Sequence, residues 1–382
     1  MALRPNLRIL AALAAAGLAL TACGSSNSSS PTAGGSGGSC GNFKIAYMGP
    51  LTGSAGALGQ NMVGGVKMAL DAYNKKNADC QVTLKTYDSQ GDPKQAPPLA
   101  TEIIQDPSIV ALIGPGFSGE SDATGKTFFA AGLPSISPSA TAVDITQQGW
   151  TTWHRIIGND SAQGAADATY LKNTANAKKV FVIDDGSAYG KGLATVVKDG
   201  LGSSVTGSDT VQTGQTDFSA TVTKVTSSGA DSVFYGGYYP EAGLLVKQLR
   251  QAGYKGLFMS GDGSEDPKFV STAGASAANG AVLTAPAGPA PSSFNQTYKQ
   301  VNGSDSGLYS TQSYDATNIV LAAIDAGKTS HTDMNDFINS YTASGVSGPI
   351  AFDKFGDVQQ TTIFAYKVKN GQLDTANPSP IS

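Results

Sequence analysis

Residues 43–87 read FKIAYMGPLTGSAGALGQNMVGGVKMALDAYNKKNADCQVTLKTY and indicate how the chain folds. This stretch opens with a strand-like run at 43–48, and a second strand-like run follows at 82–84. Between positions 60 and 76, apolar residues recur at helical spacing: Val63, Val66, Ala69, Leu70 and Tyr73. A strand, a helix and a strand in this order form the unit from which parallel sheets are built.

The alternation of strands and helices continues beyond this stretch. Helices are expected at 96–104 and 120–131, and strands at 109–113, 133–136 and 153–157. The run at 109–113 is continuously apolar, which predicts a strand buried on both faces. The pattern then restarts, with strands expected at 180–184, 204–211, 232–235, 257–259 and 281–283 and helices at 193–197, 218–225 and 242–249. We therefore expect an α/β protein with two doubly wound parallel-sheet lobes.

The last hundred residues contain too few expected strands to form a third hydrophobic core. Helical segments at 294–301, 309–326 and 334–341 must pack onto an existing lobe, and short strands at 350–352 and 362–368 finish the chain. Crossings between lobes near residues 158–159, 285–286 and 348–349 would form a three-segment hinge. The predicted N-terminal lobe is 40–158 with 286–348, and the C-terminal lobe is 159–285 with 349–382.

The N-terminus is typical of an exported protein. Arg4 and Arg8 precede an apolar run at 9–20 that is short for a membrane span, and the run ends at Leu20-Thr21-Ala22-Cys23. This arrangement resembles the processing site of bacterial lipoproteins, so we expect a signal peptide at 1–22 and a lipid on Cys23. The alternatives are an ordinary signal peptide cut nearby or a buried helix. The Ser/Gly-rich segment at 23–39 argues against the helix and predicts a flexible tether to the outer face of the cell membrane.

Composition excludes several classes of partner and bounds the architecture. Loss of Arg4 and Arg8 with the leader lowers the formal charge from -4 to -6, and no basic run is present, which argues against nucleic-acid binding. A hydrophobic fraction of 40% is that of a globular protein, and the length suffices for two domains. No second apolar run reaches membrane-spanning length, so lipid is the expected membrane contact.

The remaining cysteines, Cys40 and Cys80, each precede a strand-like run, at 43–48 and 81–87. If these strands are neighbours in a parallel sheet, their starts lie side by side and a disulfide fits, as expected in an oxidising compartment. The alternative is two unpaired thiols. The two histidines, His154 and His331, form no ligand spacing with them, so no metal site is expected.

Three loops follow strands at the edge where open α/β sheets bind ligands. The first, GPGFSG at 114–119, fits a dinucleotide fingerprint but follows the third strand, and Pro115 removes a donor; GKT at 125–127 would need a glycine where Glu120 stands. We therefore expect no cofactor. The loop can instead bring backbone N–H groups and the Ser118 hydroxyl to a carboxylate, although Ser118 would equally serve as a helix cap.

The second loop, SPSAT at 137–141, offers Thr141 as both donor and acceptor. The third, Gly261-Asp262-Gly263, belongs to the other lobe and places a carboxylate between two glycines, although an isolated aspartate there is usually a turn residue.

A resemblance distinguishes among these readings. The phrases that carry it are DPKQA (92–96), ISPSATA (136–142), YGKGLA (189–194), DFS (217–219), YGGYYPE (235–241) and FMSGDG (258–263). They resemble, in the same order, those of the leucine/isoleucine/valine-binding proteins, which are type I periplasmic binding proteins that feed ATP-driven amino-acid importers. The similarity runs from residue 43 to about residue 368.

The resemblance implies a ligand site. Ser118 and Thr141 would bind the ligand carboxylate, and the Ser139-Ala140-Thr141 loop would bind its ammonium group through the Ser139 carbonyl and the Thr141 hydroxyl, together with Asp262. Tyr189 and Tyr238 would close over the ligand from the second lobe. The side-chain pocket would be lined by Gly116, Phe117, Leu58 and Tyr309, whose apolar character suits an aliphatic group.

Three positions depart from the family's pattern. Asp262 stands where the best-known members have a glutamate, one methylene longer. Gly91 and Phe117 occupy the places of the family's usual cysteine pair, and Leu58 replaces an aromatic residue of the pocket wall. These changes leave the binding fold intact and touch the pocket or its supports.

We therefore expect a lipid-tethered, monomeric receptor that binds a branched-chain or related aliphatic amino acid and delivers it to an ABC transporter permease. The rival is a protein of the same fold that binds amides, urea or aromatic or carboxylic acids. An exported enzyme is a third reading, which the sequence disfavours because no histidine-assisted nucleophile, metal cluster or cofactor loop is evident.

Overall fold

The computed structural model describes residues 41–381 of the 382-residue chain. All of these residues belong to one compact unit. The predicted signal peptide, the lipidation site Cys23, the tether and Cys40 lie outside the described residues. Cys80 is disulfide-bonded, but because Cys40 is not described, the Cys40–Cys80 pairing stays a prediction. Among the described helices, none has the length and apolar character to cross a membrane.

The first sheet consists of five parallel strands in the order β2-β1-β3-β4-β5. They are β1 (Lys44–Gly49), β2 (Thr83–Asp88), β3 (Ile109–Ile113), β4 (Ser135–Ser137) and β5 (Trp153–Arg155). The carboxyl ends of β3 and β4 are neighbours, so the loops at 114–117 and 138–142 start side by side.

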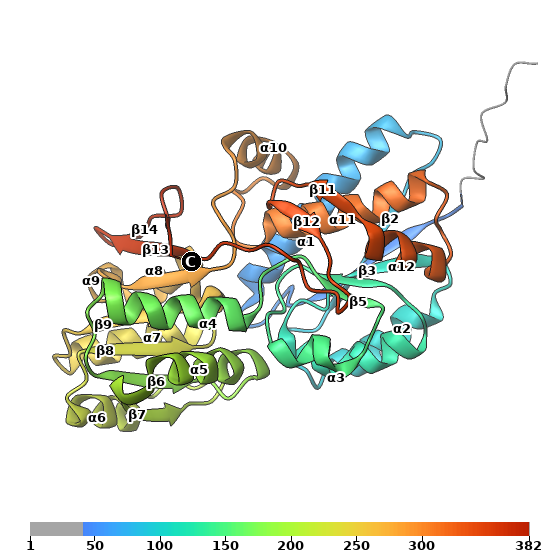
Figure 1. The fold of residues 1–382 in the computed structure, drawn as a ribbon. Coiled ribbons are helices and arrows are strands. Elements are labelled where there is room, and N and C mark those ends of the chain that lie inside the picture. Colours follow the sequence, from blue (N-terminus) through green and yellow to red (C-terminus); the bar gives the residue numbers. More distant parts are fainter. Residues whose placement is uncertain (1–40, 382) are drawn as a thin grey trace, which may run out of the picture. The chain divides into compact units, whose positions relative to one another are not determined.

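Helices cover both faces of this sheet (Figure 1). They are α1 (Gly56–Lys76), α2 (Ala96–Gln105), α3 (Ser118–Ala130), α10 (Ser292–Asn302), α11 (Ser310–Asp325) and α12 (His331–Ser340). Tyr47 of β1 shares a core with Val66 of α1, whereas the next residue, Met48, shares another with Phe128 of α3. Because successive strand residues point to opposite faces, this confirms the predicted doubly wound arrangement.

The late helices pack against the first sheet's group, mainly α11 along α1 and α12 beside β3. Gly65 permits the approach of α1 to α11, because a Cβ atom there would lie 2.2 Å from the carbonyl oxygen of Ser310. Along the chain, between α12 and β13, lies a small antiparallel pair, β11 (Thr342–Ser344) and β12 (Pro349–Ala351). The strand expected at 350–352 therefore joins neither main sheet.

The second sheet has the order β14-β13-β10-β9-β8-β6-β7, with β15 paired to β13. Its strands are β6 (Val180–Asp184), β7 (Val205–Thr210), β8 (Ser232–Gly236), β9 (Leu257–Ser260), β10 (Val282–Ala285), β13 (Phe364–Lys369), β14 (Gln372–Leu373) and β15 (Ser379–Pro380). β6 to β10 are parallel as predicted. β13 runs antiparallel to β10, and the chain between these two strands passes through α10, α11 and α12 of the first group instead of a crossover helix on this sheet.

The helices of the second group are α4 (Asp160–Thr169), α5 (Ala188–Leu201), α6 (Ser219–Ser228), α7 (Tyr239–Gln251), α8 (Pro267–Ala273) and α9 (Ala275–Ala278). Val182 of β6 packs in one core with Leu193 of α5, and its neighbour Ile183 packs in another with Leu245 of α7. Figure 1 shows α4 and α5 beside the β6–β9 strands. This sheet is therefore also covered on both faces.

Helix α4 was not predicted from the sequence. It begins after Asn159, whose side chain accepts a hydrogen bond from the Ala162 N–H at 3.3 Å. Its buried face consists largely of polar and small residues, including Asp160, Gln163 and Asp167, instead of the apolar stripe that normally reveals a helix.

The chain passes between the two sheets in three places. The segments are 156–159 after β5, 286–291 after β10, and 352–363 between β12 and β13. The third segment pairs with β5 on its way, through a bridge between Arg155 and Asp357.

Candidate functional site

The two polar loops of the first sheet are joined by Ser118. Its hydroxyl oxygen accepts hydrogen bonds from the N–H groups of Thr141 at 3.2 Å and Ala142 at 3.1 Å. Ser118 is the first residue of α3, so its N–H and that of Gly119 have no partner within the helix. The structure thus brings together the predicted carboxylate-binding residues at a helix N-terminus.

Glu120 occupies part of this helix N-terminus. It is fully buried, accepts the Phe117 N–H at 2.5 Å and contacts the Ser89 hydroxyl. Burial raises the pKa of the Glu120 carboxyl to about 7, although both hydrogen bonds act to lower it. The Phe117 N–H is therefore committed to Glu120, and the donors left at this helix start are the N–H groups of Ser118, Gly119 and Glu120.

Thr141 is the least satisfied residue of the loop. Its side chain is fully buried, and its hydroxyl forms no hydrogen bond of ordinary geometry with any described residue. It lies close enough to Asp160 to lower the pKa of that carboxyl, and the Thr141 carbonyl accepts the Asp160 N–H at 2.9 Å. Ser139 instead turns its hydroxyl to the Gly116 carbonyl oxygen. A buried hydroxyl without a well-formed hydrogen bond is costly, so Thr141 is poised to bind a polar group.

Asp262 accepts hydrogen bonds from two tyrosine hydroxyls. It starts the short 3-10 turn Asp262–Ser264 after β9 and is 1% exposed. Tyr189, at the start of α5, donates to its Oδ1 at 2.7 Å, and Tyr309, just before α11, donates to its Oδ2 at 2.5 Å. Burial raises the pKa of Asp262, while the Tyr309 and Tyr189 hydrogen bonds lower it. Tyr309, expected only at the pocket wall, therefore also bonds directly to the acid.

Aromatic rings from the two groups of elements meet beside Asp262. The ring centroids of Phe117 and Tyr238 are 4.5 Å apart, and those of Tyr238 and Tyr189 are 5.3 Å apart. Leu58 on α1 belongs to the same hydrophobic cluster as Phe117 and Tyr309, and Tyr238 packs against that cluster. The predicted aromatic and aliphatic residues are thus contiguous.

Two buried acids of α4 were missed by sequence reasoning. Asp160 and Asp167 are fully buried, and none of their carboxylate oxygens forms a hydrogen bond of ordinary geometry within the described chain. Burial, with the charge of Asp262 adding to it, raises the pKa of Asp160 to about 8. Gln163 lies between them on the same helix face and donates to Thr284. The spacing i, i+3, i+7 of three polar residues was the available signal, but it needed α4 to be recognised first.

Arg155 holds the loop at 138–142 in place through hydrogen bonds to its carbonyl oxygens, and sequence reasoning missed this role as well. Its side chain is fully buried, and one guanidinium nitrogen donates to the carbonyl oxygens of Ala140 at 3.0 Å and Ala142 at 2.8 Å. Its Nε forms an ion pair with Asp357, in the third crossing segment. The carbonyls flanking Thr141 are therefore tied to the hinge.

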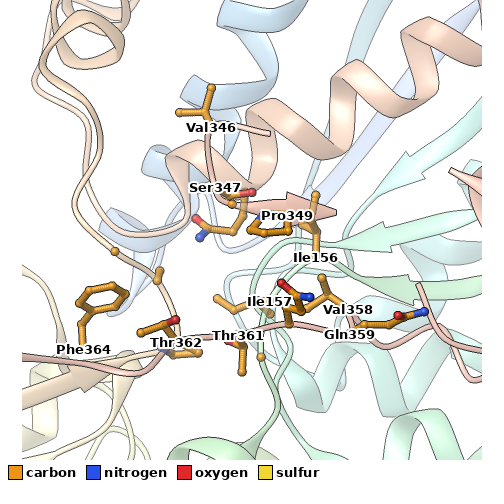
Figure 2. A pocket seen from close by; sticks show the side chains of 17 residues that line it. Ile156, Ile157, Val346, Ser347, Pro349, Val358, Gln359, Thr361, Thr362 and Phe364 are labelled. Atoms are coloured by element: carbon orange, nitrogen blue, oxygen red, sulfur yellow. The ribbon is translucent and has the colours of Figure 1, made fainter. Parts of the chain in front are cut away.

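A cavity of about 670 Å³ lies where the three crossing segments meet (Figure 2). Ile157 comes from the first crossing, Pro286 from the second and Val358 and Thr361 from the third. Of the predicted site residues, none lines this cavity, whereas Tyr309 lines a different cavity of about the same volume. The structure therefore holds open space beside the site and at the hinge.

The protein consists of two parallel-sheet groups joined by three crossings, and both groups contribute to a buried cluster of carboxylate, hydroxyl and aromatic groups. This arrangement defines a two-lobed small-molecule-binding protein. A family model described as periplasmic binding protein matches residues 42–372. The chain belongs to this family.

Two named relatives match this chain over most of its length. The chain is 29% identical over 334 residues to the leucine-, isoleucine-, valine-, threonine-, and alanine-binding protein of Pseudomonas aeruginosa, covering 85% of this chain and 89% of that protein. It is 31% identical over 331 residues to the leucine-specific-binding protein of Salmonella typhimurium, covering 83% and 88%.

A solved structure is similar over the same region. It is the branched-chain amino acid transporter substrate binding protein LivJ from Streptococcus pneumoniae in complex with isoleucine. The TM-score is 0.82 at 26% identity, and the match covers 89% of this chain and all of that one.

Proposed function

We propose that this protein captures a branched-chain or related aliphatic amino acid between its two lobes and delivers it to the permease of an ABC importer. The observation that carries the proposal is Asp262, a buried carboxylate held by Tyr189 and Tyr309 from the two groups of elements. The names of the relatives and the isoleucine complex of the similar structure support the same ligand class.

The polar groups suit the two ends of an amino-acid zwitterion. The N–H groups of Ser118 and Gly119 and the hydroxyls of Ser118 and Thr141 would bind the carboxylate, which also gains from the positive end of the α3 dipole. The ammonium group would bind Asp262, the Ser139 carbonyl and the Thr141 hydroxyl. A charge-assisted bond to Asp262 would repay the cost of burying that acid.

The apolar cluster suits an aliphatic side chain. Leu58, Phe117, Tyr238 and Tyr309 offer carbon surface without a charge to pair. Gly116 lets its loop pack closely on the neighbouring one, since a Cβ atom at its position would lie 3.0 Å from Pro50 and 3.1 Å from Gly49. The side chain of an aliphatic ligand would therefore leave water and pack against these residues.

Closure would occur about the three crossings. We assign residues 40–158 with 286–348 to the N-terminal lobe and 159–285 with 349–382 to the C-terminal lobe. The third crossing runs through 352–363. Because all three segments must bend together, the lobes would open and close as units.

The exported, anchored state belongs to the same proposal. Family membership implies an extracytoplasmic location. A lipid on Cys23 and the tether at 23–39 would keep this monomeric receptor near its permease and raise its effective concentration there. A Cys40–Cys80 disulfide would fasten the tether to the first lobe. The protein would act by binding and release, without covalent chemistry.

Calorimetric titration of the leader-less, ligand-free protein tests the proposal. Leucine, isoleucine, valine and alanine are titrated beside propionamide, urea and benzoate, which represent the rival ligand classes. Submillimolar binding of an aliphatic amino acid is expected. Binding of an amide, urea or benzoate with none of the amino acids would overturn the assignment, and turnover of any ligand would revive an enzymatic reading.

A further inference from the structure

A cavity of about 670 Å³ lies beside the amino-acid site, and Tyr309 belongs to both because it lines the cavity and donates a hydrogen bond to Asp262. Its volume falls within the range of small-molecule pockets. It is lined by the turn after β9, the loops on either side of α10, the start of α11 and strand β13. Of the residues assigned to the proposed amino-acid site, Tyr309 alone lines this cavity.

Glu265 gives the cavity its chemistry. It lines the cavity, is 4% exposed, and its carboxylate forms no hydrogen bond or ion pair with any described residue. The charge of Glu265 raises the pKa of Tyr309 and of Tyr366, which line the same cavity, so the carboxylate lies near both hydroxyls. The Tyr366 hydroxyl already donates to the Ala287 carbonyl and the Tyr309 hydroxyl to Asp262. Neither tyrosine proton is therefore available to Glu265.

Within the described chain, no lysine or arginine lines this cavity. The other acid at its rim, Asp305, is exposed and paired with Lys299. Burial, with the charges of Asp266 and Asp262 adding to it, raises the pKa of Glu265 well above its ordinary value. An unpaired acid this deeply buried is costly, and a cation is the partner that would restore its charge.

We propose that this cavity is a second binding site, for a primary amine or guanidinium on a short aliphatic stem, with the Glu265 carboxylate as its counter-ion. The Glu265 N–H donates to the Asp262 carbonyl at 2.9 Å, so the two acids belong to one turn. The cation has two sources. It is either the side chain of an amino acid whose own ammonium sits at Asp262, which rests on the proposed function, or a separate small amine.

Titrations of the leader-less protein distinguish these sources. Lysine and norleucine, which have similar stems and differ in the terminal amine, test the side-chain source. Putrescine, titrated with and without saturating leucine, tests the separate amine. Glu265→Gln removes the charge and keeps the shape, and Asp305→Asn is the matched control on the rim of the same cavity.

We expect Glu265→Gln to lower the affinity for lysine relative to leucine, or the affinity for putrescine, by about tenfold or more, which corresponds to about 1.4 kcal/mol. Asp305→Asn should leave both affinities within about twofold. Thermal unfolding of each variant checks that it folds. No binding of lysine or putrescine at millimolar concentration, or binding that Glu265→Gln leaves unchanged, overturns the proposal.

The leucine titration keeps the two proposals apart. Absence of leucine binding with putrescine binding intact would remove the amino-acid assignment and leave the cation site standing. Leucine binding without any effect of Glu265→Gln on cations would do the reverse.

Discussion

The hydroxyl of Tyr309 donates to Oδ2 of Asp262 at 2.5 Å, which joins the loop before α11 to the turn after β9. The bond crosses from the elements around the first sheet to those of the second. Asp262 thus gains a hydrogen bond, which favours its ionised form, only while the two groups are in contact. Contact between the lobes and the charge of the proposed ammonium partner are therefore coupled.

Tyr309→Phe should weaken leucine binding most at acidic pH. The Tyr309 hydrogen bond lowers the pKa of Asp262, so its loss raises that pKa further and protonates the acid at higher pH. A hydrogen bond of this kind contributes about 1–3 kcal/mol. We expect the acid limb of the affinity–pH profile, measured calorimetrically, to move to higher pH. Tyr254→Phe is the control, because the Tyr254 hydroxyl has no hydrogen-bond partner among the described residues. If the acid limb lies at the same pH in wild type and Tyr309→Phe, the proposed role of Asp262 is contradicted.

Asp262→Asn should separate ligands by their ammonium group. Leucine loses its charged partner, and we expect a loss of about 2 kcal/mol or more, roughly 30-fold in Kd. 4-Methylpentanoate has the same carbon skeleton as leucine without the amine, so its weak binding should change far less. The measurement is a pair of calorimetric or competition titrations on both proteins. Equal losses for the two ligands would mean that Asp262 acts on the fold instead of the ammonium.

The fold could be predicted from the sequence because its strands carry strong local patterns. The strand β3 is a continuous apolar run, and α1 has a clear apolar stripe, so both were found close to their observed bounds. The loops after β3 and β4 followed from the same argument, since neighbouring parallel strands end at one edge.

The parts that were missed depend on tertiary contacts. Helix α4 buries Asp160, Gln163 and Asp167, and burial of polar groups leaves no hydrophobic period to detect. Arg155 and Asp357 are 202 positions apart, and nothing local indicates that they pair. Tyr309 could be placed near the site by resemblance, but its bond to Asp262 follows only from the packing of α11.

Asp160→Asn should stabilise the ligand-free protein, increasingly so as the pH rises. The Asp160 pKa is raised from 3.8 to about 8, so the folded state keeps a proton that the unfolded state releases. Its contribution to stability is therefore fully present below about pH 3.8 and is lost as the pH rises toward about 8. Asparagine stays neutral throughout.

The expected gain for Asp160→Asn is at most about 5 kcal/mol near pH 8, at about 1.4 kcal/mol per unit of pKa difference, and it shrinks toward zero near pH 4. Denaturant unfolding at several pH values measures it. Asp305→Asn, at an exposed position, should show no such trend. A constant difference across the pH range would mean that Asp160 ionises as readily in the folded chain as in the unfolded one.

Arg155→Met should destabilise the protein and loosen the Ser139–Thr141 loop. The substitution removes the Arg155 donor from Oδ1 of Asp357 and from the carbonyl oxygens of Ala140 and Ala142. Breaking one side of a buried ion pair costs about 3–5 kcal/mol, whereas Lys75→Met, which removes an exposed pair with Asp71, should cost less than about 1 kcal/mol.

Because Arg155 holds the carbonyls that flank Thr141, its loss should also lower leucine affinity at a temperature where the variant is fully folded. Asp357→Asn keeps the contacts between Arg155 and the loop carbonyls, so it should reduce stability while affecting affinity less. Thermal unfolding and titration of both variants provide the comparison. If the two variants lower affinity equally, the ion pair with the third crossing, and not the grip on the loop, sets the position of Thr141.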